Sequence, residues 1–459
     1  MRRAVIASIL LAALSLLVVA PAPSYDPWAW VLWGDQVAGD GLRTLEGPSF
    51  KPLPVAVCVL LVAFGPAAPW LWVLVARVGA ALAVLLAFRV GRQLAGGSVL
   101  AGVLAAVGVA LSGGYLGLAA AGASEGLLLA STLAGAEAWR RGRPRWALAC
   151  GVAAALVRVE TWLFLLAAGV LVWRRRPQDR PLLVAAAVFI PVAWILPEVV
   201  GSGQALRSAA RARVPNPGQP GLSDTPVLAS LRAAVALPLW PLWAGVALGA
   251  WSGWRRRDRA ARALLAPATA GLAWMGLVAA MAAAGFSGEP RYALPGAALV
   301  AVSGAAGLVV ACRRTARAAP GLARGLMAGT LTLLLVAAGA TRAGEAVDLP
   351  ASQAYQWRLQ ADLAAAVAGV GGPDDVLACG RPHVGPLRGP VAAYRLGVPK
   401  HVVEPDRVPQ APGVVFRSRL TPEERPAPAV PAGFRQVADA GAWQVFADCS
   451  RPADRSSSR

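Results

Sequence analysis

Apolar runs of roughly twenty residues, separated by short arginine clusters, recur along this chain as far as residue 341. A run of this length can cross the hydrocarbon core of a bilayer as an α-helix. Because that core holds no water, the spans must be helices that satisfy their own backbone groups. The composition agrees, since 57% of the 459 residues are hydrophobic and only 15% are charged. The sequence therefore predicts an α-helical polytopic membrane protein.

The arginine clusters give the predicted orientation of the spans. Loops rich in Arg and Lys face the cytoplasm, so clusters such as Arg140–Arg143 and Arg174–Arg176 predict inner loops. The formal net charge of +20 is spread over these loops and does not form one basic stripe, so nucleic-acid binding is not predicted. About eleven spans follow, with the N-terminus in the cytoplasm. They are expected at residues 4–20, 69–88, 97–112, 122–138, 145–157, 161–173, 181–197, 233–253, 264–285, 295–312 and 325–341.

The first apolar run has a second interpretation. Residues 4–20 resemble a secretory signal peptide, with a small-residue cleavage site at Ala20–Ala22. Pro21 and Pro23 would hinder cleavage there, so we expect a retained first helix followed by an outer loop over residues 21–68.

Residues 342–450 are predicted to form a separate extracytoplasmic α/β domain, and 451–459 a disordered tail. The remainder, 1–341, is the transmembrane domain. An amphipathic helix is expected at 351–370. Short buried strands are expected at 375–379, 400–403, 413–416 and 443–446.

Cysteine and histidine usage bears on the same domain. Cys379 and Cys449 both lie in the predicted extracytoplasmic part, where an oxidising environment favours a disulfide between them. His383 and His401 are the only two histidines, and they form no cluster with cysteines. A zinc site is therefore not predicted.

The first polar stretch after the first span runs from Ser24 to Asp35. It carries two carboxylates, Asp26 and Asp35, with three tryptophans between them. Tryptophan favours the bilayer–water interface, and a carboxylate among such rings is partly desolvated. The simpler interpretation is that Asp26 is only the N-cap of a helix that begins at Pro27.

Nearly all other polar side chains that are not in the inner arginine clusters map to the predicted outer ends of spans. Ionisable groups at membrane depth usually pair or line a functional cavity. Arg158 and Glu160 could instead be a salt bridge that pins a tight hairpin, and Arg291 could reach the headgroups. Several such residues on one face favour a shared outer cavity. The residues are Asp26, Asp35, Glu46, Lys51, Glu125, Arg158, Glu160, Glu289, Arg291 and Tyr292.

The order of four short motifs resembles the GT-C glycosyltransferases, a superfamily that includes protein O-mannosyltransferases and the aminoarabinose transferase of lipid A. The motifs are Tyr25–Pro27 after the first span, Phe50–Pro54 before an interfacial helix at 55–64, the apex Val157–Trp162 and the turn Glu289–Pro295. The similarity covers roughly residues 1–300. The chain departs from many relatives at Pro27, where they have a second acid.

The resemblance implies transfer of a sugar from a polyprenyl phosphate to an acceptor on the outer face, with inversion at the anomeric carbon. It implies Asp26 as the base for the acceptor hydroxyl, with Asp35 as the second candidate. Lys51, Arg158 and Arg291, together with Tyr292, would bind the donor phosphate. Glu125, Glu160 and Glu289 would support them.

Several features stay open at this point. No cofactor is expected, although Asp26, Asp35 and Glu160 could together hold a divalent metal. A mannose- or arabinose-type sugar and a glycan, lipid or protein acceptor in a bacterial envelope are expected. The alternatives are a flippase or transporter of a lipid-linked substrate, which should show ionisable residues near span midpoints, broken helices and internal repeats, and a non-catalytic scaffold in the plasma membrane.

Overall fold

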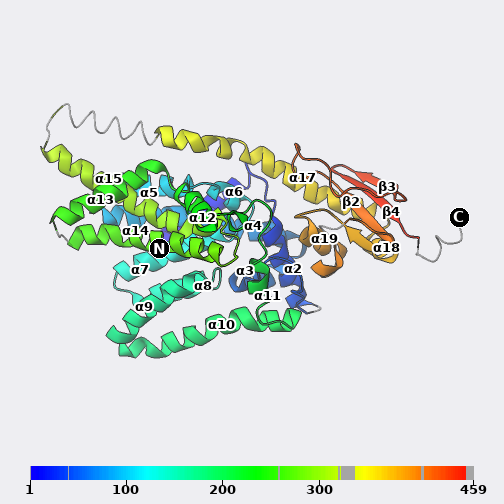
Figure 1. Ribbon diagram of the computed structural model, residues 1–459, viewed down its shortest axis with the longest axis horizontal. Coiled ribbons are helices and arrows are strands. Elements are labelled where there is room, and N and C mark those ends of the chain that lie inside the picture. Colours follow the sequence, from blue (N-terminus) through cyan, green and yellow to red (C-terminus); the bar gives the residue numbers. More distant parts are fainter. Residues whose placement is uncertain are drawn as a thin grey trace.

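The computed structural model describes residues 2–39, 41–256, 259–318, 321, 336–404 and 408–450. Figure 1 shows a body of helices at one end and a small sheet near the C-terminus at the other. The long helix α17 (Leu349–Ala368) leads from the body to the sheet. The predicted tail 451–459 lies outside the described residues. The proposed boundary at residue 341 stays a prediction.

The helical body contains most of the chain between its first helix and residue 318. Its α-helices are α1 (Arg2–Ser15), α2 (Tyr25–Ala38), α3 (Pro52–Leu61), α4 (Ala68–Leu94), α5 (Val99–Ala110), α6 (Tyr115–Ala120), α7 (Glu125–Arg140), α8 (Pro144–Ala155), α9 (Thr161–Arg175), α10 (Arg180–Ser202), α11 (Arg207–Ala212), α12 (Pro226–Val235), α13 (Trp240–Arg256), α14 (Arg259–Ala283) and α15 (Leu294–Ala318). Short 3-10 turns are η1 (Val62–Ala67), η2 (Pro177–Asp179), η3 (Pro220–Leu222) and η4 (Pro290–Ala293).

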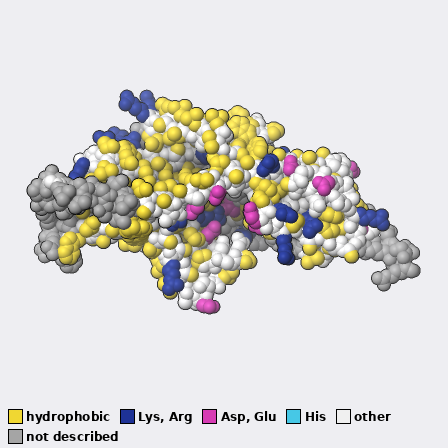
Figure 2. All heavy atoms as spheres, turned by 90° about the horizontal axis from the view of Figure 1, so that it is seen from above, with side chains coloured by type: hydrophobic (Ala, Val, Ile, Leu, Met, Phe, Trp, Pro, Cys, Tyr) yellow, Lys and Arg dark blue, Asp and Glu magenta, His cyan; other side chains and the backbone are white. Residues whose placement is uncertain are grey.

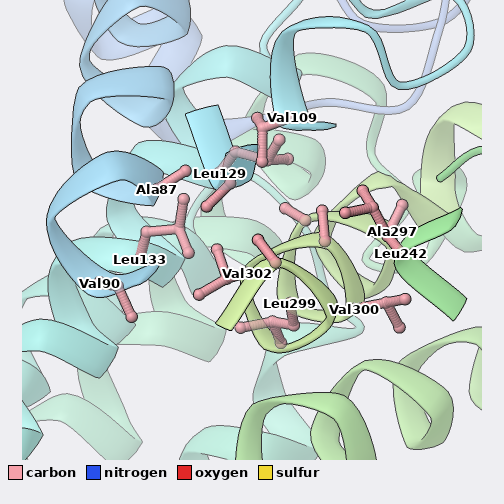
Figure 3. Packing of buried hydrophobic residues seen from close by; sticks show 14 of the residues in the cluster. Ala87, Val90, Val109, Leu129, Leu133, Leu242, Ala297, Leu299, Val300 and Val302 are labelled. Atoms are coloured by element: carbon pink, nitrogen blue, oxygen red, sulfur yellow. The ribbon is translucent and has the colours of Figure 1, made fainter. Parts of the chain in front are cut away.

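The apolar core of this body lies between α4, α5, α7, α13 and α15. Figure 3 shows Leu129 and Leu133 of α7 facing the α15 side chains, with Leu242 of α13 on the other side. Helices α13 and α15 approach closely through glycines, since a Cβ at Gly304 would lie only 2.1 Å from the Leu242 carbonyl oxygen. Small residues at helix crossings are typical of membrane bundles, where packing rather than hydrophobic burial holds helices together.

The structure supports a membrane protein but not yet a count of eleven spans. Among the described residues, four helical segments are long and apolar enough to cross a bilayer. They are Pro52–Leu94, Pro177–Ser202, Ala263–Ala283 and Pro290–Arg314, and a bent pair of helices would make a fifth. The predicted span at 325–341 falls largely outside the described residues, which resume at 336. The number eleven therefore stays a prediction.

Helix α10 illustrates the expected exposure to lipid. Its segment has a mean hydropathy of 2.2, yet only 11% of it is buried inside the protein. It runs along one edge of the helical body in Figure 1. Apolar side chains such as Val188 and Phe189 are 60% and 52% exposed, which suits a helix whose partner is hydrocarbon.

The predicted span at 233–253 is broken in the structure. Helices α12 and α13 meet at an angle of 91° across the sequence Ala236–Leu239. Pro238 lies in this break and Pro241 is the second residue of α13. Proline lacks a backbone N–H and its ring clashes with the preceding turn, so two prolines in four residues end one helix and start another. A hydropathy window does not detect this break because both prolines sit among apolar residues.

The C-terminal part is a mixed α/β unit, as predicted, but two of its elements differ. Its sheet has the order β1-β2-β4-β3, with β1 parallel to β2 and the other pairs antiparallel. The elements are α17, α18 (Pro373–Cys379), β1 (Arg381–His383), α19 (Gly389–Leu396), η5 (Lys400–Val402), β2 (Gly413–Arg417), β3 (Arg435–Ala440) and β4 (Trp443–Asp448).

The helix predicted at 351–370 and the strands predicted at 413–416 and 443–446 are confirmed by α17, β2 and β4. The strands predicted at 375–379 and 400–403 are wrong, because these residues form α18 and mostly η5. Pro373 opens α18, and the acidic side chains of Asp374 and Asp375 lie in its first turn, an arrangement that stabilises a helix N-terminus.

A disulfide joins Cys379 and Cys449 in this part of the chain. It ties the end of α18 to the residue that follows β4, across 70 positions of sequence. The bond therefore closes the C-terminal unit around its sheet.

The C-terminal unit rests on α2. The rings of Trp28 and Tyr394 lie 5.4 Å apart, and Gln360 of α17 donates a hydrogen bond to the Pro23 carbonyl at 2.8 Å. Lys400 makes an ion pair with Glu46, at 2.6 Å between Nζ and Oε2. Glu46 of the predicted site set thus contacts the C-terminal unit.

Candidate active site

Helix α2 begins at Tyr25, and Ser24 occupies its N-cap position. The interpretation of Asp26 as the N-cap is therefore wrong, because Asp26 already lies in the first helical turn. A carboxylate in that turn is favoured by the helix dipole. Its side chain is 17% exposed and free to make a longer-range contact.

Asp26 and Asp35 point away from opposite sides of this helix. Nine residues correspond to two and a half turns, a half-turn offset with a rise of about 13 Å along the axis. Trp30, near Asp26 on the helical wheel, contacts Lys51. Trp28, near Asp35 on the wheel, contacts Tyr394 of the C-terminal unit. The structure therefore does not bring Asp35 to the group around Asp26.

Arg291 links Asp26 to the turn that precedes α15. Its Nη1 lies 3.3 Å from Asp26 Oδ2, and its Nε lies 3.0 Å from Glu289 Oε2. Arg291 sits on η4, which is held by a hydrogen bond from the Trp274 indole to the Tyr292 carbonyl at 2.8 Å. The arginine is thus shared between two carboxylates 263 positions apart in sequence and fixed by a short, anchored turn.

Arg158 and Glu160 form a bidentate ion pair at the apex between α8 and α9. Arg158 donates from Nη2 to Oε1 at 2.5 Å and from Nε to Oε2 at 3.1 Å. Both residues are buried, at 9% and 3% exposed. The guanidinium lies 3.6 Å from the ring centroid of Tyr292, which also has Arg291 at 5.3 Å. The salt bridge expected for the hairpin exists, and its tyrosine contact joins it to the Asp26–Arg291 pair.

Lys51 completes the cationic group. It is the N-cap residue of α3 and only 8% exposed. Its ammonium donates a hydrogen bond to the Ser124 hydroxyl at 2.9 Å and lies 4.9 Å from the Trp30 ring centroid. Among the described residues no carboxylate lies within ion-pair distance of Lys51, whereas Arg158 and Arg291 are each bound to carboxylates. With three donors and one protein hydrogen bond, Lys51 is the cation best placed to accept a new anion.

Glu125 faces the same space. It opens α7, is 1% exposed, and neither of its carboxylate oxygens has a hydrogen-bond partner among the described residues. Its charge interacts with those of Lys51, Arg158 and Arg291. A buried carboxylate without donors is costly, so Glu125 is suited to receive hydroxyl groups from a ligand.

The site therefore gathers three cations, four carboxylates and Tyr292. Figure 2 shows acidic side chains around a hollow in the middle of one face, with basic side chains between them. The members are Asp26, Lys51, Glu125, Arg158, Glu160, Glu289, Arg291 and Tyr292. These come from five separate segments of the chain.

A cavity of about 420 Å³ adjoins this group on the side of Arg291. Its wall combines Glu289, Arg291 and Arg342 with a largely apolar remainder, which consists of Gly113, Gly114, Leu118, Ala233, Ala236, Leu237 and Pro290. A cavity whose wall carries two arginines among mostly apolar residues suits a molecule with an anionic head and a hydrocarbon part.

Asp35 lines a second cavity, of about 500 Å³, between α2, the end of α3 and the C-terminal unit. Gln36, Arg43 and Tyr394 line it as well. Burial, with the charge of Asp35, raises the pKa of the Tyr394 phenol, so this group stays protonated at neutral pH. Asp35 therefore belongs to the contact between the two parts of the chain.

The metal set considered from the sequence is not assembled. Asp35 projects from the far side of α2, and Glu160 is held by Arg158. Within the described ranges no three His, Cys, Asp or Glu side chains are grouped so as to hold a metal ion. The expectation that no metal takes part stays a prediction.

Sequence reasoning missed the partners of the site residues. Ser124, which receives the Lys51 hydrogen bond, precedes Glu125 in the sequence and could have been inferred from that position. A buried ion pair outside the site group, between Glu198 and Arg207 at 2.7 Å, was also missed, although an acid near the end of an apolar run, as at Pro197–Val199, is itself a signal.

The arrangement to be compared with known structures comprises helices of membrane length, a group of charged side chains at helix ends, and a small α/β unit next to it. This is the fold of the GT-C glycosyltransferases, and the resemblance read from the motifs is confirmed at the level of fold.

The particular structures that show it are those of ArnT from Cupriavidus metallidurans. The complex with undecaprenyl phosphate matches with a TM-score of 0.59 and 16% sequence identity, over 98% of this chain and 99% of that one. The apo form matches with a TM-score of 0.59 and 15% identity, over 96% and 97% of the two chains. No protein-family model and no curated protein matches the sequence. At this identity the likeness establishes the fold alone.

Proposed function

We propose that this chain is a glycosyltransferase of the bacterial plasma membrane that moves a sugar from a polyprenyl phosphate to an acceptor on the outer face. The observation that carries the proposal is the Asp26–Arg291 pair within a group that also holds Lys51 and Arg158. It combines a carboxylate suited to proton abstraction with cations suited to a phosphate, both at the end of membrane helices.

The donor phosphate is bound by Lys51 and Arg291. Among the described residues Lys51 has no carboxylate partner, and Arg291 lines the largely apolar cavity. Glu160 and Tyr292 hold Arg158 in position, and Arg158 adds positive charge near Lys51 and Arg291. Such cations neutralise the charge that grows on the phosphate as it leaves. The polyprenyl chain extends into the cavity beside Arg291. The ArnT structure solved with undecaprenyl phosphate supports this choice of donor.

Transfer then proceeds by one displacement. Asp26 takes the proton of the acceptor hydroxyl, the hydroxyl oxygen forms a bond to the anomeric carbon, and the bond from that carbon to the phosphate oxygen breaks. The polyprenyl phosphate leaves with the bonding electrons, and the configuration at the anomeric carbon inverts. Glu125 accepts hydrogen bonds from hydroxyls of the transferred sugar, and Glu289 holds Arg291 in place.

The sugar is proposed to be of the mannose or arabinose type and the acceptor an envelope glycan, lipid or protein. The N-terminus is proposed to lie in the cytoplasm and residues 342–459 outside. No metal or other cofactor is required in this scheme, because the three cations carry the positive charge that the leaving group needs.

A donor screen tests the proposal. Purified protein in lipid nanodiscs would be incubated with radiolabelled polyprenyl-phosphate sugars and with crude envelope fractions as acceptors. We expect label to move from the lipid to an acceptor with at least one donor. A parallel assay uses the protein in sealed vesicles. Movement of the intact donor across the vesicle membrane, without cleavage, would support the flippase alternative. If the protein neither transfers the sugar nor moves the donor, the result would support the scaffold.

A further inference from the structure

A second buried polar cluster lies outside the proposed catalytic group. Glu198, near the end of α10, is 1% exposed and receives hydrogen bonds from three side chains. Arg207 donates from Nε at 2.7 Å and from Nη2 at 3.0 Å, and Thr44 donates from its hydroxyl at 3.1 Å. The Ser208 hydroxyl is the third donor. Four donors saturate both oxygens of the carboxylate.

The same cluster holds the segment 42–50, which lies between α2 and α3 and has no helix or strand of its own. Arg207 donates from Nη2 to the Pro48 carbonyl at 2.8 Å. The Ser208 hydroxyl accepts the backbone N–H of Phe50 at 2.7 Å. The segment is thus held by side chains that come from 150 or more positions later in the sequence.

The residue that follows this segment is Lys51. Its backbone position depends on Phe50, whose N–H is held by Ser208 and whose ring lies 5.6 Å from that of Trp33. Trp33 in turn donates to the Arg43 carbonyl at 3.1 Å. Lys51 is also the N-cap residue of α3, and the segment before it is held further by the Lys400–Glu46 ion pair and by a hydrogen bond from the Thr44 N–H to the Gly201 carbonyl at 3.0 Å.

We propose that Glu198 and Arg207 are positioning residues that set the location of Lys51 for the donor phosphate. The pair crosslinks α10 and α11 to the segment 42–50 and so fixes the start of α3. A buried ion pair often adds little net stability, because desolvation offsets the attraction between its charges. The role of this ion pair is to fix the backbone of residues 42–50, which lead directly to Lys51. The inference rests on the proposed function for the identity of the ligand.

The test compares Glu198→Gln with Glu137→Gln. Glu137 is an equally buried carboxylate, also 1% exposed, which binds Arg89 at 2.8 Å and Arg141 at 3.0 Å. It lies on α7 twelve residues from Glu125, about 18 Å along the helix axis. Both variants lose one buried charge, but only Glu198→Gln loosens the segment 42–50.

We expect Glu198→Gln to raise the KM for the polyprenyl-phosphate donor by roughly ten- to a hundredfold, the equivalent of losing one hydrogen bond between Lys51 and the charged phosphate. Its kcat should change less than threefold, and Glu137→Gln should leave the donor KM unchanged. Arg207→Lys keeps the charge but loses the bidentate contact, so its donor KM should lie between those of the wild type and Glu198→Gln. Ser208→Ala serves as the second variant if Glu198→Gln does not fold, and it should shift KM in the same direction.

Hydrogen exchange of the peptide that covers residues 42–50 separates this inference from the proposed function. Faster exchange in Glu198→Gln than in Glu137→Gln would support the crosslink even if no tested donor is turned over. An exchange rate of residues 42–50 that does not change in Glu198→Gln would overturn the inference. So would an equal loss of kcat in Glu198→Gln and Glu137→Gln, or a donor KM that stays at the wild-type value in both. Absence of transfer by the wild type would count against the proposed function only.

Discussion

Replacement of Asp26 by Asn is the substitution for which the structure gives the clearest expectation. Asn keeps the size and a carbonyl acceptor of the side chain but cannot take a proton. Loss of a general base lowers turnover by roughly 10²–10⁴-fold. We therefore expect kcat for sugar transfer to fall by that amount in Asp26→Asn.

The effect on donor binding should be much smaller. Asp26→Asn weakens the contact to Arg291, but Arg291 keeps Glu289 at 3.0 Å. The Asp26 and Arg291 side chains are 17% and 23% exposed, and a partly exposed pair of this kind contributes about 1 kcal/mol or less. Since about 1.4 kcal/mol corresponds to a tenfold change, the donor Kd should shift by less than tenfold.

The assay measures single-turnover transfer and donor Kd on the same nanodisc preparation. Asp35→Asn is the matched control, because Asp35 lies on the same helix but on its opposite side. It should reduce transfer far less than Asp26→Asn. Near-normal transfer by Asp26→Asn together with loss of transfer in Asp35→Asn would refute the choice of base, and if neither variant matters the enzyme assignment fails.

Three further predictions follow from the same geometry. Arg291→Ala should weaken donor binding before it lowers kcat, by about tenfold or more, because the phosphate loses a charged partner; an unchanged donor Kd would contradict this role. A cysteine at the exposed position Ala432, in a background without the free cysteines Cys58, Cys150 and Cys312, should react with an impermeant maleimide on intact cells; labelling only after lysis would reverse the topology. Reduction of the Cys379–Cys449 disulfide should lower the stability of the C-terminal unit by up to about 4–5 kcal/mol on the loop-entropy model, and a non-reducing peptide map with both thiols free would reject the bond.

The membrane class and the GT-C fold could be predicted from the sequence because they depend on features that are local. Apolar runs, arginine clusters and four short motifs can each be recognised within one segment of the chain. The break at Pro238 and the helix α18 also depend on local sequence, but both were predicted wrongly. The break was missed because hydropathy averaged over a window stays high across it, and α18 was predicted as a strand because of its short Val-Leu-Ala-Cys run. In both cases a proline, not hydropathy, decides the backbone.

The site could be predicted only in part. Asp26, Lys51, Arg158 and Arg291 were chosen as candidates because charged residues at the ends of apolar runs are costly, and the structure brings them into one group. The separation of Asp26 from Asp35 follows from a nine-residue offset on one helix, but only once the helix is known to include both. The partners of Glu198 could not be inferred, since Thr44 lies 154 positions away and no local pattern pairs them.

The release of polyprenyl phosphate coupled to sugar transfer tests the central claim most directly. Wild-type protein with a labelled polyprenyl-phosphate sugar and its acceptor should yield one polyprenyl phosphate for each sugar transferred, and the new glycosidic bond should have the inverted configuration. Asp26→Asn should bind the donor and yield neither product above a hundredth of the wild-type rate, the lower end of the roughly 10²–10⁴-fold loss. Donor cleavage that persists in Asp26→Asn, or transfer with retained configuration, would contradict the account.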